Sequence, residues 1–281
     1  MFGPNHSPRY HHRERDFSEH YADTARLFCE FAGIDTDDWD VFFVTGSGTC
    51  AIQTILYSLS DQLNVVTEGH FSDRIKRYLT DIGKKSNSSS KTAGVVYETS
   101  ISHLNDDLPD DIFMCDCVSS FPYYEPKGQI WATVTSKQIG CAPGLSIVVM
   151  KKSLWDDGSI NFADESYLSL GKFKAKREDH QTPHTPAITL IDDLNEKLRN
   201  WDAERFRTMI SKRRNELLMH IPTDCIIGDG PVLTLKDDER SRGLTTLFNL
   251  YNYSSDGPQI FLWSGTGKQY DKLYERLGEF Y

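Results

Sequence analysis

Lys137 and Asp116 each follow a short apolar segment, the position at which a sheet of an α/β protein commonly presents reactive side chains. Asp116 comes directly after residues 112–115, and Lys137 comes after residues 130–134 and two hydroxylic residues. A lysine amine forms a Schiff base with an aldehyde cofactor, and a carboxylate keeps a pyridine nitrogen protonated as an electron sink. The pair therefore favours a site for pyridoxal phosphate (PLP). Taken singly, the lysine is typical of a solvated surface charge and the aspartate of a turn or a helix cap.

A glycine-rich turn, Gly46-Ser47-Gly48-Thr49, separates an expected strand at 40–45 from an expected helix at 49–60. Its glycines allow backbone N–H groups to approach an anion, and the start of a helix adds free N–H groups and a favourable dipole. The same turn is typical of an ordinary strand–turn–helix joint. Alone, it favours the ordinary joint over a phosphate site.

Strands alternate with helices over the first two-thirds of the chain, which predicts an α/β domain with a mainly parallel sheet. The expected strands are 40–45, 64–67, 94–97, 112–115, 130–134 and 146–150, and the expected helices are 17–32, 49–60, 72–82 and 187–201. A helix at 203–218, strands at 226–227, 232–235, 246–251 and 259–263, and a helix at 268–280 indicate a smaller α+β domain. We expect domains at 1–202 and 203–281, with polar loops at 84–92 and around the basic residues 172–177.

The composition of the 281 residues indicates a soluble protein, with 38% hydrophobic residues and a mean hydropathy of -0.49. No apolar run approaches the roughly 20 residues of a membrane span, and no secretory leader is expected. A formal net charge of -10 disfavours broad electrostatic binding of nucleic acid. The six cysteines lack zinc-site or redox spacing, so no metal is expected and a reducing cytoplasm is the simplest location.

Several segments occur in the order found in the class V aminotransferases, the PLP-dependent fold-type I family that includes alanine–glyoxylate and aminoethylphosphonate transaminases. The turn Thr45-Gly46-Ser47-Gly48-Thr49 resembles the family's loop almost residue for residue. The other matching segments are 3–9, 12–17, 68–74, 97–100, 116–120, 135–149 and 181–188. Singly each match is weak, but their shared order over about two-thirds of the chain is specific. The resemblance implies PLP fold type I, with helices on both faces of the sheet and a reduced C-terminal domain.

The resemblance implies a role for each matched residue. Lys137 would form the Schiff base and carry protons, and Asp116 would hold the pyridinium. Phe71 would stack on one face of the ring and Val118 would pack on the other. The residues implied in cofactor binding are Ser47, Gly48, Thr49, Phe71, Thr99, Asp116, Val118, Ser136, Lys137 and Thr185. Those implied in substrate binding are Asn5, His6, Arg9 and Arg13.

Thr185 resembles a threonine that reaches the phosphate from the neighbouring subunit, which implies a homodimer with shared active sites. The same residue is also placed to cap the helix expected from about Ala187.

The chain departs from the family pattern in four ways. Thr135-Ser136 replaces the usual Ser-Gln before the lysine, and Phe121-Pro122-Tyr123-Tyr124 replaces a small Leu-Gly-Gly stretch. Residues 259–267 lack the arginine that binds the substrate carboxylate in the transaminases. The chain is also shorter than a typical member. Because neutral groups replace a bidentate clamp poorly, the missing arginine argues against ordinary amino-acid transamination.

Three functional hypotheses remain open. The first is a PLP-dependent aminotransferase that acts on a small amino substrate through an external aldimine. The second is a PLP-dependent decarboxylase or lyase, with apolar groups such as Phe121, Phe261 or Trp263 beside an unclamped carboxylate. Its substrate could include an amino-acid group on a hypermodified thymine in phage DNA. The third is a non-catalytic module on the same scaffold, which the intact Asp116 and Lys137 disfavour.

Overall fold

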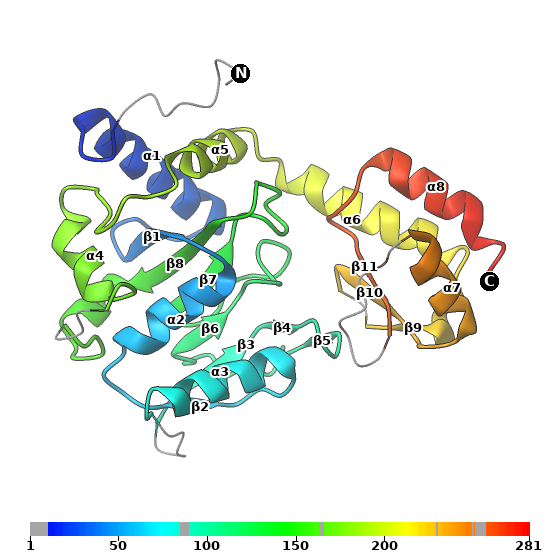
Figure 1. Ribbon diagram of the computed structural model, residues 1–281, viewed down its shortest axis with the longest axis horizontal. Helices are drawn as coiled ribbons and strands as arrows, with labels where there is room; N and C mark the ends of the chain where they lie inside the picture. Colours follow the sequence, from blue (N-terminus) through cyan, green and yellow to red (C-terminus); the bar gives the residue numbers. More distant parts are fainter. Residues whose placement is uncertain (1–10, 85–89, 163–165, 229, 249, 251–256) are drawn as a thin grey trace. The chain divides into compact units, whose positions relative to one another are not determined.

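The computed structural model describes residues 11–84, 90–162, 166–228, 230–248, 250 and 257–281 (Figure 1). The chain forms two compact units. Unit 1 comprises Met1–Thr67, Ser72–Val96 and Asp107–Trp201, and unit 2 comprises Glu68–Phe71, Tyr97–Asp106 and Asp202–Tyr281. Two short segments of the N-terminal half therefore belong to the C-terminal unit.

Unit 1 is built on a six-stranded sheet with the order β1-β8-β7-β6-β3-β2. Its strands are β1 (Trp39–Thr45), β2 (Leu63–Val65), β3 (Lys91–Val95), β6 (Met114–Asp116), β7 (Ile130–Val134) and β8 (Leu145–Lys151). Strands β2, β3, β6 and β7 pair in parallel, whereas β8 is antiparallel to both β7 and β1. All strands except β8 therefore end at the same edge of the sheet, where β8 begins.

Helices cover both faces of this sheet. The helices are α1 (Arg15–Ala32), α2 (Gly48–Ser58), α3 (His70–Asp81), α4 (Leu170–Arg177) and α5 (Ile188–Arg199), with a short 3-10 helix at Lys152–Trp155. Successive side chains of a strand point to opposite faces. Phe43 of β1 contacts Tyr21 of α1, with ring centroids 4.9 Å apart, and Phe42 contacts Phe173 of α4 at 5.4 Å. Helix α1 therefore covers one face of β1 and α4 covers the other.

Unit 2 contains a three-stranded antiparallel sheet, β11-β10-β9, and a two-stranded sheet, β4-β5. The strands are β4 (Tyr97–Glu98), β5 (His103–Leu104), β9 (Ile226–Ile227), β10 (Val232–Leu235) and β11 (Gln259–Phe261). The helices are α6 (Ala203–Leu218), α7 (Glu239–Phe248) and α8 (Gly267–Leu277), with a 3-10 helix at Thr223–Cys225. Thr266 and Gln269 form a capping box at the start of α8.

The structure corrects three sequence-based expectations. The strand expected at 246–251 is wrong, because α7 extends to Phe248. The loop expected at 172–177 is also wrong, since these residues belong to α4, which Ser169 caps by accepting a hydrogen bond from Gly171 N–H at 3.2 Å. Thr185 does not cap α5, because the N-cap position is Ala187, whose N–H donates to Thr45 Oγ1 at 3.0 Å.

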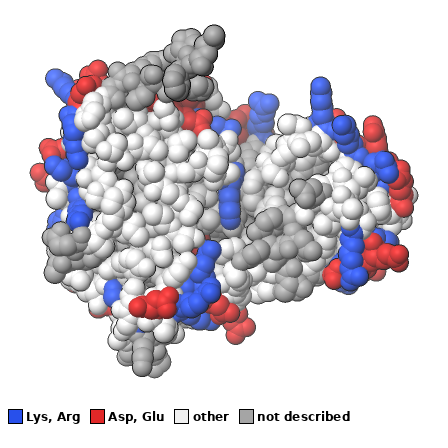
Figure 2. Space-filling model, viewed as in Figure 1, with Lys and Arg blue, Asp and Glu red and all other residues white. Residues whose placement is uncertain are grey.

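Charged side chains of both signs lie close together along the margins of the face shown in Figure 2. None of the helices within the described ranges combines the length and the apolar character that a membrane span requires. All six cysteines are free, and Cys29, Cys115, Cys117 and Cys225 are buried. Burial raises the pKa of the Cys117 thiol to about 12, which leaves it a poor nucleophile near neutral pH.

Candidate active site

Three features predicted from the sequence meet at the edge of the unit 1 sheet where β1, β6 and β7 end. Asp116 is the last residue of β6, Lys137 follows β7, and the turn 46–48 follows β1. The residues that join them are Val118 and Ser119, just beyond Asp116. We refer to residues 116–119 as the central segment.

Lys137 contacts the central segment directly. Its Nζ donates a hydrogen bond to Ser119 Oγ at 2.6 Å. The adjacent Gln138 fixes the same serine, because its Nε2 donates to Ser119 O at 2.7 Å, and its Oε1 accepts from Tyr123 N–H at 2.9 Å. The amine is thus held beside β6 by a buried amide network. The sequence did not single out Ser119 or Gln138, although both lie inside matched segments.

Asp116 is buried, with 4% of its surface exposed, and its Oδ1 accepts a hydrogen bond from Val118 N–H at 2.8 Å. This hydrogen bond fixes the orientation of the Asp116 carboxylate. Asp116 is the first residue of the central segment, and Lys137, which follows the neighbouring strand β7, reaches Ser119 in the same segment. This is the arrangement that the spacing of the two residues predicted.

The glycine-rich turn leads directly into α2, which begins at Gly48 with Ser47 as its N-cap residue. The first hydrogen bond of the helix start runs from Cys50 N–H to Ser47 O at 2.8 Å. The N–H groups of Gly48 and Thr49 precede it, and such groups are available to an anion. A Cβ built on Gly48 would lie 2.7 Å from Val118 Cγ2, so the backbone here packs against the central segment as only glycine permits.

The residues around the lysine and the turn have different degrees of exposure. Ser136 and Thr49 are half-buried, whereas Ser47 and Thr185 are exposed. Thr135 anchors the lysine segment, because its N–H and Oγ1 both donate to Leu145 O at 3.2 Å.

Arg13 binds the segment that precedes Thr185. Its Nη1 donates to Gln181 Oε1 at 3.0 Å and to Thr182 O at 2.9 Å, and its Nη2 donates to Pro183 O at 3.4 Å. The guanidinium therefore holds a loop of unit 1. Asn5, His6 and Arg9, the other predicted substrate residues, lie outside the described residues.

Phe71 and Thr99 belong to unit 2, whereas Lys137 and Asp116 belong to unit 1. Within unit 2, Phe71 N–H donates to both carboxylate oxygens of Glu98, at 3.2 and 3.1 Å. The carbonyl of Thr99 accepts a hydrogen bond from Gln259 Nε2 at 2.6 Å. Both predicted cofactor contacts are thus fixed by buried polar groups.

The structure changes one expectation about the pocket and adds one observation. Phe121 is not available to a substrate, because it is 3% exposed and packs between Phe28 and Trp131, with centroids at 5.7 and 5.3 Å. In unit 2, Arg213 Nη1 donates to Leu262 O and Ser264 O. This arginine therefore binds backbone carbonyls of residues 259–267, the segment that would carry the carboxylate-binding arginine in the transaminases.

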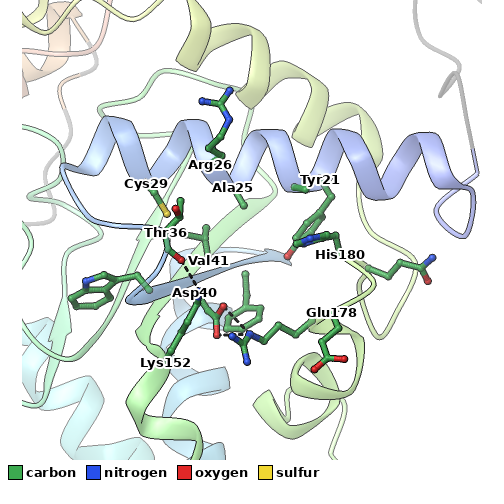
Figure 3. A pocket seen from close by; sticks show the side chains of 15 residues that line it. Tyr21, Ala25, Arg26, Cys29, Thr36, Asp40, Val41, Lys152, Glu178 and His180 are labelled. Carbon is green, nitrogen blue, oxygen red and sulfur yellow. Dashed lines mark hydrogen bonds and ion pairs between the residues drawn. The ribbon is translucent and has the colours of Figure 1, made fainter.

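A cavity of about 410 Å³ lies at the other end of β1, where it is lined by residues that include Tyr21, Cys29, Asp40 and Lys152 (Figure 3). Asp40 is held there by Trp155 Nε1 at 2.6 Å and by Arg177 Nε at 2.9 Å. Ligands of such sheets bind beyond the carboxyl ends of the strands. The cavity borders the first half of β1 and is therefore separate from the central segment.

Comparison with solved structures finds the same fold in aminotransferases. A phosphoserine aminotransferase from Cytophaga hutchinsonii matches with a TM-score of 0.75 and 17% identity, covering 96% of this chain and 91% of that chain. An aspartate aminotransferase of subgroup IV from Thermus thermophilus gives 0.79 and 17%, covering 97% and 92%. This chain has the aminotransferase fold. An alanine–glyoxylate aminotransferase from Nostoc sp. gives 0.78 and 16%, covering 98% and 89%.

These identities establish the fold, and they confirm the prediction of an α/β protein of PLP fold type I. No family model matches the sequence, and no curated protein does. The matches cover about nine-tenths of each of these three structures. Within the described ranges, no group of His, Cys, Asp or Glu residues is arranged to hold a metal ion.

Proposed function

We propose that this protein is a PLP-dependent enzyme of the aminotransferase type that acts on an amino-group substrate. Three groups converge on the central segment, and this observation carries the proposal. Lys137 Nζ lies 2.6 Å from Ser119 Oγ, and Asp116 begins the segment at the end of the neighbouring strand. The start of α2 packs on Val118. An amine, a buried acid and free helix N–H groups match the aldehyde, the ring nitrogen and the phosphate of PLP. When bound, PLP supplies an electron sink for the carbanion of the substrate.

Each residue of the chain has a distinct task in this proposal. Lys137 attaches the cofactor and, when released, accepts and returns the substrate proton at Nζ. Asp116 keeps the ring nitrogen protonated through a charge-assisted hydrogen bond. Gly48 and Thr49 donate backbone N–H groups to the phosphate. The remaining cofactor contacts that we propose are Ser47, Phe71, Thr99, Val118, Ser136 and Thr185.

We further propose a homodimer in which Thr185 contacts the phosphate bound by the partner subunit. Thr185 is exposed, and Arg13 holds the segment before it, so the residue is free to face another molecule on a fixed loop. Light scattering should give twice the mass of the 32.1 kDa chain. A PLP-bound and active monomer would contradict the shared site.

The attachment residue is tested by reducing the PLP-treated protein with borohydride and mapping its peptides. The adduct should lie on Lys137, and Lys137→Ala should bind PLP without covalent attachment. Lys152→Ala is the matched control, because Lys152 is also half-buried in unit 1 but lines the separate cavity. An adduct on any other lysine would refute the assignment.

The reaction type is tested by the products of a single turnover. Transamination leaves pyridoxamine phosphate, whereas decarboxylation releases carbon dioxide and restores the original cofactor. Because residues 259–267 contain no arginine and Arg213 binds backbone carbonyls, we expect weak turnover with alanine and stronger turnover with a larger amino substrate. Rapid transfer from alanine to glyoxylate would show that a carboxylate clamp exists elsewhere.

A further inference from the structure

Glu98 is a fully buried carboxylate with 0% exposure, and its neighbours include the backbone on which Phe71 stands. Phe71 N–H donates to its Oε1 at 3.2 Å and to its Oε2 at 3.1 Å. Ser100 Oγ donates to the same carboxylate at 2.5 Å. These hydrogen bonds fix the start of α3.

Ser100 extends this contact to the preceding residue. While its hydroxyl donates to Glu98, its Oγ accepts a hydrogen bond from His70 N–H at 3.0 Å. Consecutive N–H groups of α3 are therefore held by one serine–glutamate pair. The first N–H groups of a helix have no acceptor within the helix, and the serine–glutamate pair supplies acceptors for these two.

Gly69 shows how closely Glu98 approaches the chain. A Cβ built on Gly69 would lie 2.3 Å from Glu98 Cγ, and the φ of Gly69 is +120°, a value that favours glycine. The glutamate side chain therefore lies directly against residues 69–71. The turn carrying Glu98 is itself anchored, because Gln259 Nε2 donates to Thr99 O and, at 3.0 Å, to Thr234 Oγ1.

We infer that Glu98 is a positioning residue that, with Ser100, fixes the backbone of residues 69–71 so that the Phe71 ring is held ready to stack on the cofactor. The inference rests on the proposed function, in which Phe71 stacks on PLP. In this inference Glu98 acts through the backbone N–H of Phe71 and, by way of Ser100, through that of His70. A side chain on a fixed backbone loses less freedom on binding, so removing the clamp should weaken affinity.

The test compares PLP affinity and backbone protection in Glu98→Gln with the unmodified protein. The glutamine keeps the shape but replaces one acceptor oxygen with a donor, so a contact to Phe71 N–H or Ser100 is lost. We expect PLP to bind about 10-fold more weakly or worse, as is common when a supporting residue is removed. Hydrogen exchange of residues 69–71 in the PLP-free protein should be faster.

Asp40→Asn is the matched control, because Asp40 is also a buried carboxylate held by two side-chain donors, Trp155 and Arg177, but lies at the separate cavity. It should lower the unfolding midpoint without changing PLP affinity or the exchange of residues 69–71. Ser100→Ala is a milder variant that should act in the same direction if Glu98→Gln fails to fold.

A double-mutant cycle separates positioning from general destabilisation. In a Phe71→Leu background, the effect of Glu98→Gln on PLP affinity should largely disappear, because the stacking ring is already gone. The induced circular dichroism of bound PLP should fall in Glu98→Gln and stay normal in Asp40→Asn. Full additivity, or an unchanged affinity in Glu98→Gln and Ser100→Ala, overturns the inference. If the unmodified protein binds no PLP, the proposed function itself is refuted. If it binds PLP but the variants bind it equally well, only the inference about Glu98 fails.

Discussion

Replacing Gly48 by alanine should push the start of α2 away from the central segment. The added Cβ would lie 2.7 and 2.9 Å from the two γ-carbons of Val118 and 3.1 Å from Val134 Cγ1, whereas ordinary contacts begin at 3.4 Å. The helix start or the valine must therefore move by roughly 0.7 Å. Val134 is the last residue of β7 and Val118 lies just after β6. Because both neighbours are held by the sheet, we expect a cost of about 1–3 kcal/mol in the free energy of unfolding.

Urea unfolding of the PLP-free protein measures this cost, and Gly267→Ala provides the control. Gly267 is also the first residue of a helix, but no atom of the described residues lies within 4 Å of a Cβ built on it. That variant should be equal to the unmodified protein or up to about 1 kcal/mol more stable, since alanine is the better helix former. Equal stabilities for the two alanine variants would refute the packing argument.

A second mutation identifies the clash. In a Val118→Ala background the two closest methyl groups are absent and only the 3.1 Å contact with Val134 Cγ1 remains, so the cost of Gly48→Ala should fall below about 1 kcal/mol. PLP affinity offers a separate measurement. A misplacement of the helix N-terminus by about 1 Å is enough to lower binding or turnover by about 10- to 100-fold.

Three further predictions follow from the site and its surroundings. Asp116→Asn should lower turnover by about 100-fold or more with an unchanged fold by circular dichroism, and near-normal turnover would exclude the pyridinium role. Arg13→Ala should raise KM for a carboxylate substrate; an unchanged KM with a lower melting temperature would instead assign Arg13 to holding residues 181–183. Burial raises the pKa of the Cys29 thiol from 9.0 to about 11, so its contribution to stability is complete below pH 9 and is lost as the pH rises toward 11. Urea unfolding across that range should show the decline, and Cys29→Ala should reduce it.

The sequence predicted the strands of the unit 1 sheet and four of its helices because their apolar patterns were decisive. Strands β1, β7 and β8 are fully or nearly fully buried runs, and they formed within a residue or so of the expected positions. The helix expected at 203–218 has these bounds as α6. The sequence also predicted that Asp116, Lys137 and the glycine turn lie at one edge of the sheet, because the carboxyl ends of parallel strands share that edge.

The elements that were missed have weak or conflicting local patterns. Helix α4 buries only Leu170 and Phe173 among basic residues, so its sequence favoured a solvated loop. The aromatic and β-branched residues near 246–251 favoured a strand, yet α7 is fixed at its start by Asp238, which accepts from Ser241 N–H at 2.8 Å. That Asp-x-x-Ser spacing was a readable helix-start signal.

The two N-terminal segments of unit 2 had no local signal that assigns them to it. Its segments Glu68–Phe71 and Tyr97–Asp106 are far in sequence from the C-terminal residues that they join. The hydrogen bond from Gln259 to Thr99 spans 160 positions, and no periodicity or motif encodes such a pairing. The buried role of Glu98 was hidden for the same reason, because its partners became apparent only in three dimensions.

The antiparallel course of β8 has a consequence for the mobility of the lysine. The chain leaves β7 and returns as β8 through a short connection, closed by Cys141 N–H to Thr135 O at 3.0 Å and by Thr135 N–H to Leu145 O. Gly46 N–H also donates to Gly144 O at 2.8 Å, which ties the connection to the turn after β1. Because both ends of the loop are attached to neighbouring strands, its backbone has little freedom to move. The amine should therefore travel by rotation of its own four-carbon side chain, and the amide groups of residues 135–145 should be as ordered on the nanosecond timescale as those of the sheet.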